Sequence, residues 1–127
     1  MGHSKLSQKV FSPIIKLLKS LFFVIIGLRR YCRVVGDSMQ PTINPGDFLI
    51  YKPLKNQTHR LEEGKLVVIK HPIQNKQLLV KRIFKLALPL IEVRGDNKDR
   101  SIDSRQFGLI RKEQIMGIVE EIIPRKV

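Results

Sequence analysis

A single hydroxyl stands in a strongly constrained stretch in the first third of the chain. The run VVGDSMQPTINPGD, residues 34–47, places Ser38 among two prolines and two glycines, so it predicts a loop and not a helix or the middle of a strand. A nucleophilic serine needs an exposed hydroxyl, a backbone N–H that can hold an oxyanion, and a base. The loop can supply the first two, because Gly36 allows the backbone to bend next to Ser38. The base has to come from elsewhere in the sequence.

The chain offers histidines and lysines as candidates for this base. His3 lies in the N-terminal tail, His59 in a polar loop, and His71 before a proline at a strand end, where a turn role is expected. Lys81 lies in the apolar segment QLLVKRIF, where burial of the ammonium would lower its pKa and free the neutral amine to act as a base. In a strand, Lys81 and Arg82 would point to opposite faces, so one of them can face inward. From this segment alone, two surface charges on an edge strand remain the simpler interpretation.

A third polar segment, GDNKDRSIDSRQFG at residues 95–108, lies between two apolar segments. It holds three aspartates, two serines and two arginines. Calcium is not predicted, because basic residues occupy positions that an EF-hand fills with oxygen ligands and no glutamate closes the loop. A salt-bridged structural loop accounts for Asp103 and Arg105. The single cysteine, Cys32, excludes an internal disulfide and argues against a zinc site, so neither a metal nor a cofactor is predicted.

Short β-branched segments make up most of the chain after Arg30. They are separated by turn signals such as NPG at 44–46 and EEG at 62–64, and read YCRVVG, DFLIYK, KLVVIK, LLVKRIF, LIEVRG and IMGIVEEII. This pattern predicts an all-β fold, a small antiparallel β-barrel or sandwich, over residues 31–127. Helix is predicted only at the N-terminus, over residues 1–30.

The N-terminal segment is both basic and apolar. The net charge of the chain is +13, and its first 33 residues carry seven basic residues and no acidic one. The stretch from Val10 to Leu28 is 19 residues long, enough to cross a hydrocarbon core of about 30 Å, but Lys16 and Lys19 interrupt it. Residues 1–30 are therefore predicted to form a membrane-associated helix, which spans the bilayer or lies in its interface. Cationic residues at both ends leave its orientation open.

Three of these segments together resemble the signature boxes of the type I signal peptidases, including the mitochondrial inner-membrane peptidases. They are GDSMQPT around Ser38, VKRI around Lys81, and GDNKDRSIDSRQFG at residues 95–108. The resemblance extends from about Val34 to Pro124 and implies a serine endopeptidase with a Ser/Lys dyad on an all-β scaffold. It further implies that the substrate is a precursor protein with an N-terminal presequence. Ser38 would be the nucleophile, Lys81 the general base, and Ser101 the hydroxyl that orients the lysine amine.

The same resemblance assigns supporting roles. Asp103 and Arg105 would form an ion pair that braces the site, with Asp103 kept clear of Lys81 because a nearby carboxylate would raise the pKa of the amine. Four residues would shape the nucleophile loop: Gly36, Asp37, Met39 and Pro41. Larger members carry a side-chain hydroxyl two residues before the nucleophile, where this chain has Gly36, so the oxyanion would rely on backbone N–H groups, chiefly that of Ser38.

The chain is more compact than many members of that family. Only residues 83–94, a stretch of 12, separate Arg82 from Gly95, which leaves no room for a second β domain. This compactness, with the His71-Pro72 pair upstream of LLVKRI, most resembles the nickel-type superoxide dismutase maturation proteases. The substrate implied is the N-terminal propeptide of that enzyme; the first alternative is a general type I signal peptidase acting on exported proteins.

Two other interpretations fit less of the sequence. SOS-repressor-like Ser/Lys autoproteases share GDSM-PT and KR, but they lack the GDN box, and residues 1–33 show an apolar run in place of a helix-turn-helix. A non-catalytic β domain that binds a membrane surface or nucleic acid would suit the charge of +13. With no tryptophan, two tyrosines and six phenylalanines, the chain offers no stacking platform, and nucleic acid is not predicted as a partner.

Overall fold

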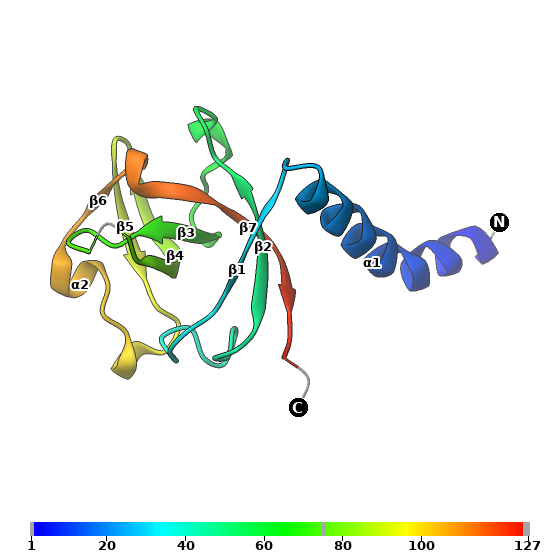
Figure 1. Cartoon of the computed structure of the whole chain (residues 1–127), viewed down its shortest axis with the longest axis horizontal. Helices are drawn as coiled ribbons and strands as arrows, with labels where there is room; N and C mark the ends of the chain where they lie inside the picture. The colour runs from blue at the N-terminus through cyan, green and yellow to red at the C-terminus, as the bar shows by residue number, and fades with distance from the viewer. Residues whose placement is uncertain (1, 75, 126–127) are drawn as a thin grey trace.

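The computed structural model describes residues 2–74 and 76–125, with side chains from Pro13 onward. One antiparallel sheet of seven strands, in the order β1-β2-β7-β3-β4-β5-β6, curls into a half-barrel, and helix α1 projects from it (Figure 1). The all-β prediction with one hydrophobic N-terminal helix is confirmed. The elements are α1 (Gly2–Ile25), β1 (Arg30–Arg33), β2 (Phe48–Pro53), β3 (Leu66–Lys70), β4 (Leu78–Ala87), β5 (Leu90–Arg94), α2 (Ser104–Phe107), β6 (Ile110–Arg111) and β7 (Ile115–Ile123), with short 3-10 turns at Thr58–Arg60, Lys98–Arg100 and Lys112–Gln114.

Buried aliphatic residues of the central strands form the core around the predicted base. In β3, Val67 and Ile69 are fully buried, and Val67 lies opposite Lys81 of β4. Ile83, two residues after Lys81, joins the same apolar cluster. Because side chains two apart in a strand share a face, the lysine stem enters the interior together with these aliphatic residues.

The polar loop of residues 95–108 differs from the prediction that helix occurs only at the N-terminus. Asp103 caps the short helix α2, accepting from the backbone N–H of Arg105, while the side chain of Gln106 bonds back to the N–H of Asp103. This capping box satisfies backbone donors that would otherwise lack partners at the start of the helix. A run rich in Asp and Ser thus forms a turn of helix and not an irregular loop, and the prediction was wrong here.

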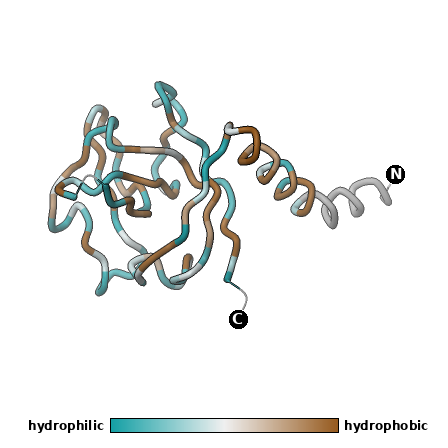
Figure 2. Tube along the Cα trace, in the orientation of Figure 1, coloured by the Kyte–Doolittle hydropathy of each residue, from teal (hydrophilic) through white to brown (hydrophobic). Residues whose placement is uncertain are grey.

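Helix α1 begins at Gly2, before the predicted apolar stretch Val10–Leu28, and ends at Ile25, three residues before the end of that stretch. Its Ser20 is buried against the sheet, whereas Ile14, Leu18 and Ile25 are exposed. Figure 2 shows the apolar character of its C-terminal half. Among the residues that the structure describes, no helix combines the length and the apolar character that crossing a bilayer requires.

Candidate active site

The loop between β1 and β2 carries the predicted nucleophile. Met39 and Ile43 anchor it in the core, and the N–H of Ile43 donates to the carbonyl of Met39 at 3.0 Å. Gly36 adopts a φ of +88°, in the left-handed region that glycine occupies without steric cost. The loop therefore turns sharply just before Ser38, which is half-buried, while Pro41 on its far side is exposed.

Ser38 opens onto a small, mostly apolar cavity of about 260 Å³. One wall comes from the segment that follows β1, and the other from the start of β4. The residues that line it are Cys32, Arg33, Val34, Val35, Ser38, Met39, Gln77, Leu78, Leu79 and Val80. A serine at the rim of an apolar cavity is where a nucleophile would meet a bound peptide.

Lys81 is 2% exposed, and its amine makes a single directed contact in the part of the chain that the structure describes. Its Nζ donates to Ser101 Oγ at 3.1 Å, and Ser101 Oγ in turn donates to Asp103 Oδ2 at 2.7 Å. Ser101 itself is buried. The hydroxyl thus fixes the direction of the amine, and the carboxylate fixes the direction of the hydroxyl.

Asp103 is fully buried and saturated with donors. Its carboxylate accepts from the N–H of Gly95 at 2.8 Å and from Arg105 through both Nε at 3.0 Å and Nη2 at 2.8 Å. Burial opposes the charge, but these hydrogen bonds, led by that of Arg105, hold the pKa of Asp103 far below its usual range. The structure therefore contains the expected ion pair between Asp103 and Arg105.

The separation of Asp103 from Lys81 is only partial. No ion pair joins the two within the described residues, yet Asp103 lies one hydroxyl away. Burial lowers the pKa of Lys81, the Asp103 carboxylate raises it, and the Arg105 guanidinium lowers it, with the net direction downward. The prediction that Asp103 stays clear of Lys81 is therefore wrong in part, because the carboxylate does raise the pKa of the amine. Desolvation and Arg105 offset that effect.

Gly95 joins the two halves of the site. A Cβ built on it would clash with Ser101 Oγ, and would lie 2.5 Å from Ser101 Cβ and 2.7 Å from the carbonyl oxygen of Ser38. Only a glycine fits between the nucleophile loop and the hydroxyl that holds Lys81. The structure does not, however, place Ser38 Oγ in a hydrogen bond with Lys81 Nζ among the described residues.

Sequence reasoning missed the role of Asn97, which ties the nucleophile loop to the polar loop. Its backbone N–H donates to the carbonyl of Ser38 at 2.9 Å, and its Nδ2 donates to the carbonyl of Asp37 at 3.0 Å. Asp37 also pairs with Arg100 at 2.9 Å. The sequence feature that could have indicated this role is the GDN run, which directly follows a strand.

Asp96 was missed as well. Its Oδ1 accepts from Nε of Arg82 at 2.9 Å, and its Oδ2 accepts both from Nη2 of Arg82 at 2.7 Å and from the hydroxyl of Thr42 in the nucleophile loop. Its backbone N–H also donates to Met39 Sδ at 3.4 Å. Arg82, which points away from Lys81, thus braces the loop from the opposite face of β4.

The histidines lie apart from this cluster wherever their side chains are described. His71 Nδ1 accepts the backbone N–H groups of Ile73 and Gln74 at 3.0 and 3.1 Å, which is the expected turn role. His59 lies in the 3-10 turn Thr58–Arg60. The side chain of His3 falls outside the described residues.

Comparisons with known proteins bear on the family to which the chain belongs. A family model described as "Signal peptidase, peptidase S26" matches residues 7–89. Mitochondrial inner membrane protease subunit 2 of Mus musculus is 28% identical over 98 residues, which cover 60% of this chain and 56% of that protein. Mitochondrial ATP-independent inner membrane protease subunit 1a of Arabidopsis thaliana is 30% identical over 107 residues, which cover 66% of this chain and 64% of that protein. The chain spans about three fifths of the length of these relatives. With most of its length matched by the family model, the chain belongs to the signal peptidase family, peptidase S26.

Proposed function

We propose that the protein is a serine endopeptidase that uses Ser38 and Lys81 as a catalytic dyad, with residues 31–127 as its catalytic domain. The observation that carries this proposal is the buried amine of Lys81, held by Ser101 on one side of Gly95, with the Ser38 loop on the other. A lysine in this setting has a lowered pKa, so its neutral form is accessible as a base.

The chemistry would run in two halves. Neutral Lys81 takes the proton of Ser38 Oγ as that oxygen attacks the scissile carbonyl, and the backbone N–H of Ser38 stabilises the oxyanion. The lysine then gives the proton to the leaving amine, and an acyl-enzyme remains on Ser38. Water attacks the ester in the second half, with Lys81 again accepting and returning the proton.

The sheet offers a place for an extended substrate. Among the described residues, β1 lies at the edge of the sheet and pairs with β2 alone. Residues 78–80 of β4 pair with β3 on one side, and their other side is open because the pairing of β4 with β5 begins at Arg82. Both open edges border the cavity beside Ser38. A peptide in extended conformation can therefore add main-chain hydrogen bonds at these edges, while its small apolar side chains enter the cavity.

We propose an N-terminal presequence as the substrate, with the propeptide of nickel-type superoxide dismutase as the first precursor and exported proteins as the alternative. The compact chain between Arg82 and Gly95 supports the first. Incubation of the protein with each precursor, followed by N-terminal sequencing of the products, separates the two. Self-cleavage without either precursor would favour the autoprotease interpretation instead.

The experiment that tests the dyad is a pH–rate profile on one cleaved peptide. Because the base must be neutral, kcat/KM is expected to rise with pH through one ionisation below the ordinary lysine value of about 10.4. Ser101→Ala is expected to lower kcat/KM by about 10- to 1000-fold through loss of amine positioning. His71→Ala should stay within a few-fold of wild type. If the rising limb disappears in His71→Ala and survives changes at Lys81, the base is histidine.

We also propose that residues 1–30 hold the enzyme at a membrane, which the exposed apolar residues of α1 support. A shortened chain starting at Arg30 keeps all seven strands, so it is expected to remain in the soluble fraction and to cleave a soluble peptide. The full chain should sediment with membranes after lysis. Recovery of the full chain entirely in the soluble fraction would contradict the membrane role, and loss of cleavage in the shortened chain would contradict the domain division.

A further inference from the structure

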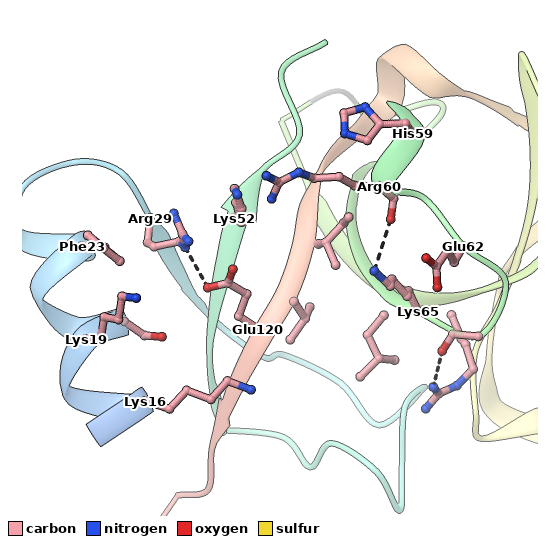
Figure 3. Close-up of a pocket in the computed structure, with 16 residues that line it drawn as sticks. Lys16, Lys19, Phe23, Arg29, Lys52, His59, Arg60, Glu62, Lys65 and Glu120 are labelled. Carbon is pink, nitrogen blue, oxygen red and sulfur yellow. Dashed lines mark hydrogen bonds and ion pairs between the residues drawn. The ribbon is translucent and has the colours of Figure 1, made fainter. Parts of the chain in front are cut away.

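A second, larger cleft lies on the side of the sheet where α1 joins it. It encloses about 880 Å³ between α1, the start of β3, β7 and the 3-10 turn Thr58–Arg60 (Figure 3). Neither Ser38 nor Lys81 lines it, and Arg82 is its link to the bracing network of the site. The cleft is therefore separate from the cavity in which a peptide would be cut.

The charge of this cleft is strongly unbalanced. Seven cationic side chains line it, against the carboxylates of Glu62 and Glu120. Arg29 pairs with Glu120 at 2.7 Å, while Lys16 pairs with Glu121 at 4.0 Å and Arg82 pairs with Asp96, both outside the cleft. Four cations form no ion pair with any residue that the structure describes: Lys19, Lys52, Arg60 and Lys65.

The like charges act on one another. Burial lowers the pKa of Lys52, and the nearby guanidinium groups of Arg60 and Arg29 lower it further. Figure 3 shows Lys52, Arg60 and Lys65 reaching the same space from β2, the 3-10 turn and the segment before β3. A cleft that concentrates unmatched positive charge attracts an anion, and an anion bound there would relieve the repulsion.

The position of α1 indicates where that anion would come from. Ile14, Leu18, Leu21, Phe22 and Ile25 follow one another at helical spacing and are all exposed, from 40% for Leu21 to 82% for Ile25. Lys19 lines the cleft from the same helix, and Phe22 of the stripe lies three residues after it, so the two are neighbours on the helix surface. Its ammonium lies 5.7 Å from the ring of Phe23, which lines the cleft. Apolar and cationic surfaces thus meet along one helix.

From this juxtaposition we propose that the cleft between α1 and the sheet binds the phosphate of an anionic phospholipid, whose acyl chains lie along the apolar stripe of α1. Basic residues beside an apolar helical face are the pattern that draws a protein to an anionic lipid surface. The proposal rests on the membrane association proposed above and adds a specific headgroup site to it. It is independent of the dyad.

The first measurement uses the full chain and two kinds of vesicle. Binding to vesicles of phosphatidylcholine alone reports the apolar stripe, and the gain on adding phosphatidylglycerol reports the cleft. The gain is expected to be about tenfold or more, and to fall as salt is added. Equal binding to both vesicles overturns the headgroup site while leaving membrane association standing, and binding to neither overturns both.

Matched variants separate the cleft from the overall charge. The triple variant Lys52→Gln, Arg60→Gln, Lys65→Gln is expected to lose most of the phosphatidylglycerol-dependent gain. The control variant Lys70→Gln, Lys85→Gln, Lys98→Gln removes the same charge from exposed positions outside the cleft and should keep the gain within about twofold. Equal losses in the two variants would show a general charge effect and overturn the proposal.

Lysine footprinting on the wild-type chain does not depend on how the variants fold. Vesicles containing phosphatidylglycerol should slow acetylation of Lys52 and Lys65 relative to Lys70 and Lys85. Protection by inorganic phosphate alone, equal to that by the vesicles, would identify a free anion as the ligand and overturn the lipid assignment. Protection by polyglutamate without protection by the vesicles would point to an acidic protein segment and overturn it as well. Unchanged reactivity of Lys52 and Lys65 in every arm would remove the site.

Discussion

Ser38→Ala and Lys81→Met are each expected to reduce peptide cleavage by about 1000-fold or more, and the double variant should be no worse than either single one. The hydroxyl and its base act as one unit in the proposed mechanism, so their losses do not add. Methionine is the replacement at Lys81 because it keeps much of the volume of a side chain that is 2% exposed. Loss of activity would then reflect the missing amine and not a cavity.

The matched control lies on the same strand. Lys85→Met removes an exposed lysine from β4 and should retain nearly full activity. Rates are measured on one cleaved peptide by mass spectrometry, with melting temperatures recorded for every variant. Cleavage by a folded Ser38→Ala or Lys81→Met protein at more than about one tenth of the wild-type rate would rule out the dyad.

Gly95→Ala should also inactivate the protein, for a steric reason alone. A Cβ there would meet Ser101 and the carbonyl oxygen of Ser38 at distances that no relaxed structure allows. The loop and the serine have to move apart, which we expect to cost about 1–3 kcal/mol of stability and about 100-fold in kcat/KM. Both quantities are measured, by denaturant unfolding and on the same peptide.

Gly27→Ala provides the comparison for this prediction. Gly27 has a φ of +84° and open space around its Cβ position, so alanine introduces backbone strain without a clash. It should lose about 1 kcal/mol of stability and keep its kcat/KM. Full activity in Gly95→Ala would show that the nucleophile loop and Ser101 are not held in register by this contact.

Most of the fold was accessible from the sequence because its strands are short β-branched segments bounded by turn signals. Every predicted strand segment contains or overlaps an observed one, and only β6, two residues long, was missed. The order of strands was not accessible, since it depends on which edges meet once the sheet curls. The local helix α2 was missed because its Asp and Ser residues favour loops and helix caps equally, and only the closed capping box decides between them.

The candidate site was also predicted only in part. The resemblance of the three boxes to those of the type I signal peptidases predicted roles for Ser38, Lys81 and Ser101, and the structure brings Lys81 and Ser101 into contact. Asp96 and Asn97 escaped notice because their partners, Thr42, Arg82 and the carbonyls of the nucleophile loop, lie far away in the sequence. The effect of Asp103 on the pKa of Lys81 was misjudged because it depends on the spatial arrangement in which both residues hydrogen-bond to the hydroxyl of Ser101.

The place of β7 in the sheet has a consequence for how the protein comes to be active during synthesis. Residues 115–123 pair with β2 on one side and with β3 on the other. Without them, the sheet falls into two parts, with the Ser38 loop between β1 and β2 in one and Lys81 and Ser101 in the other. During synthesis, the two parts cannot join through this strand until β7 has been made, and until then only the contacts between the Ser38 loop and residues 95–100 connect the proposed nucleophile to the proposed base.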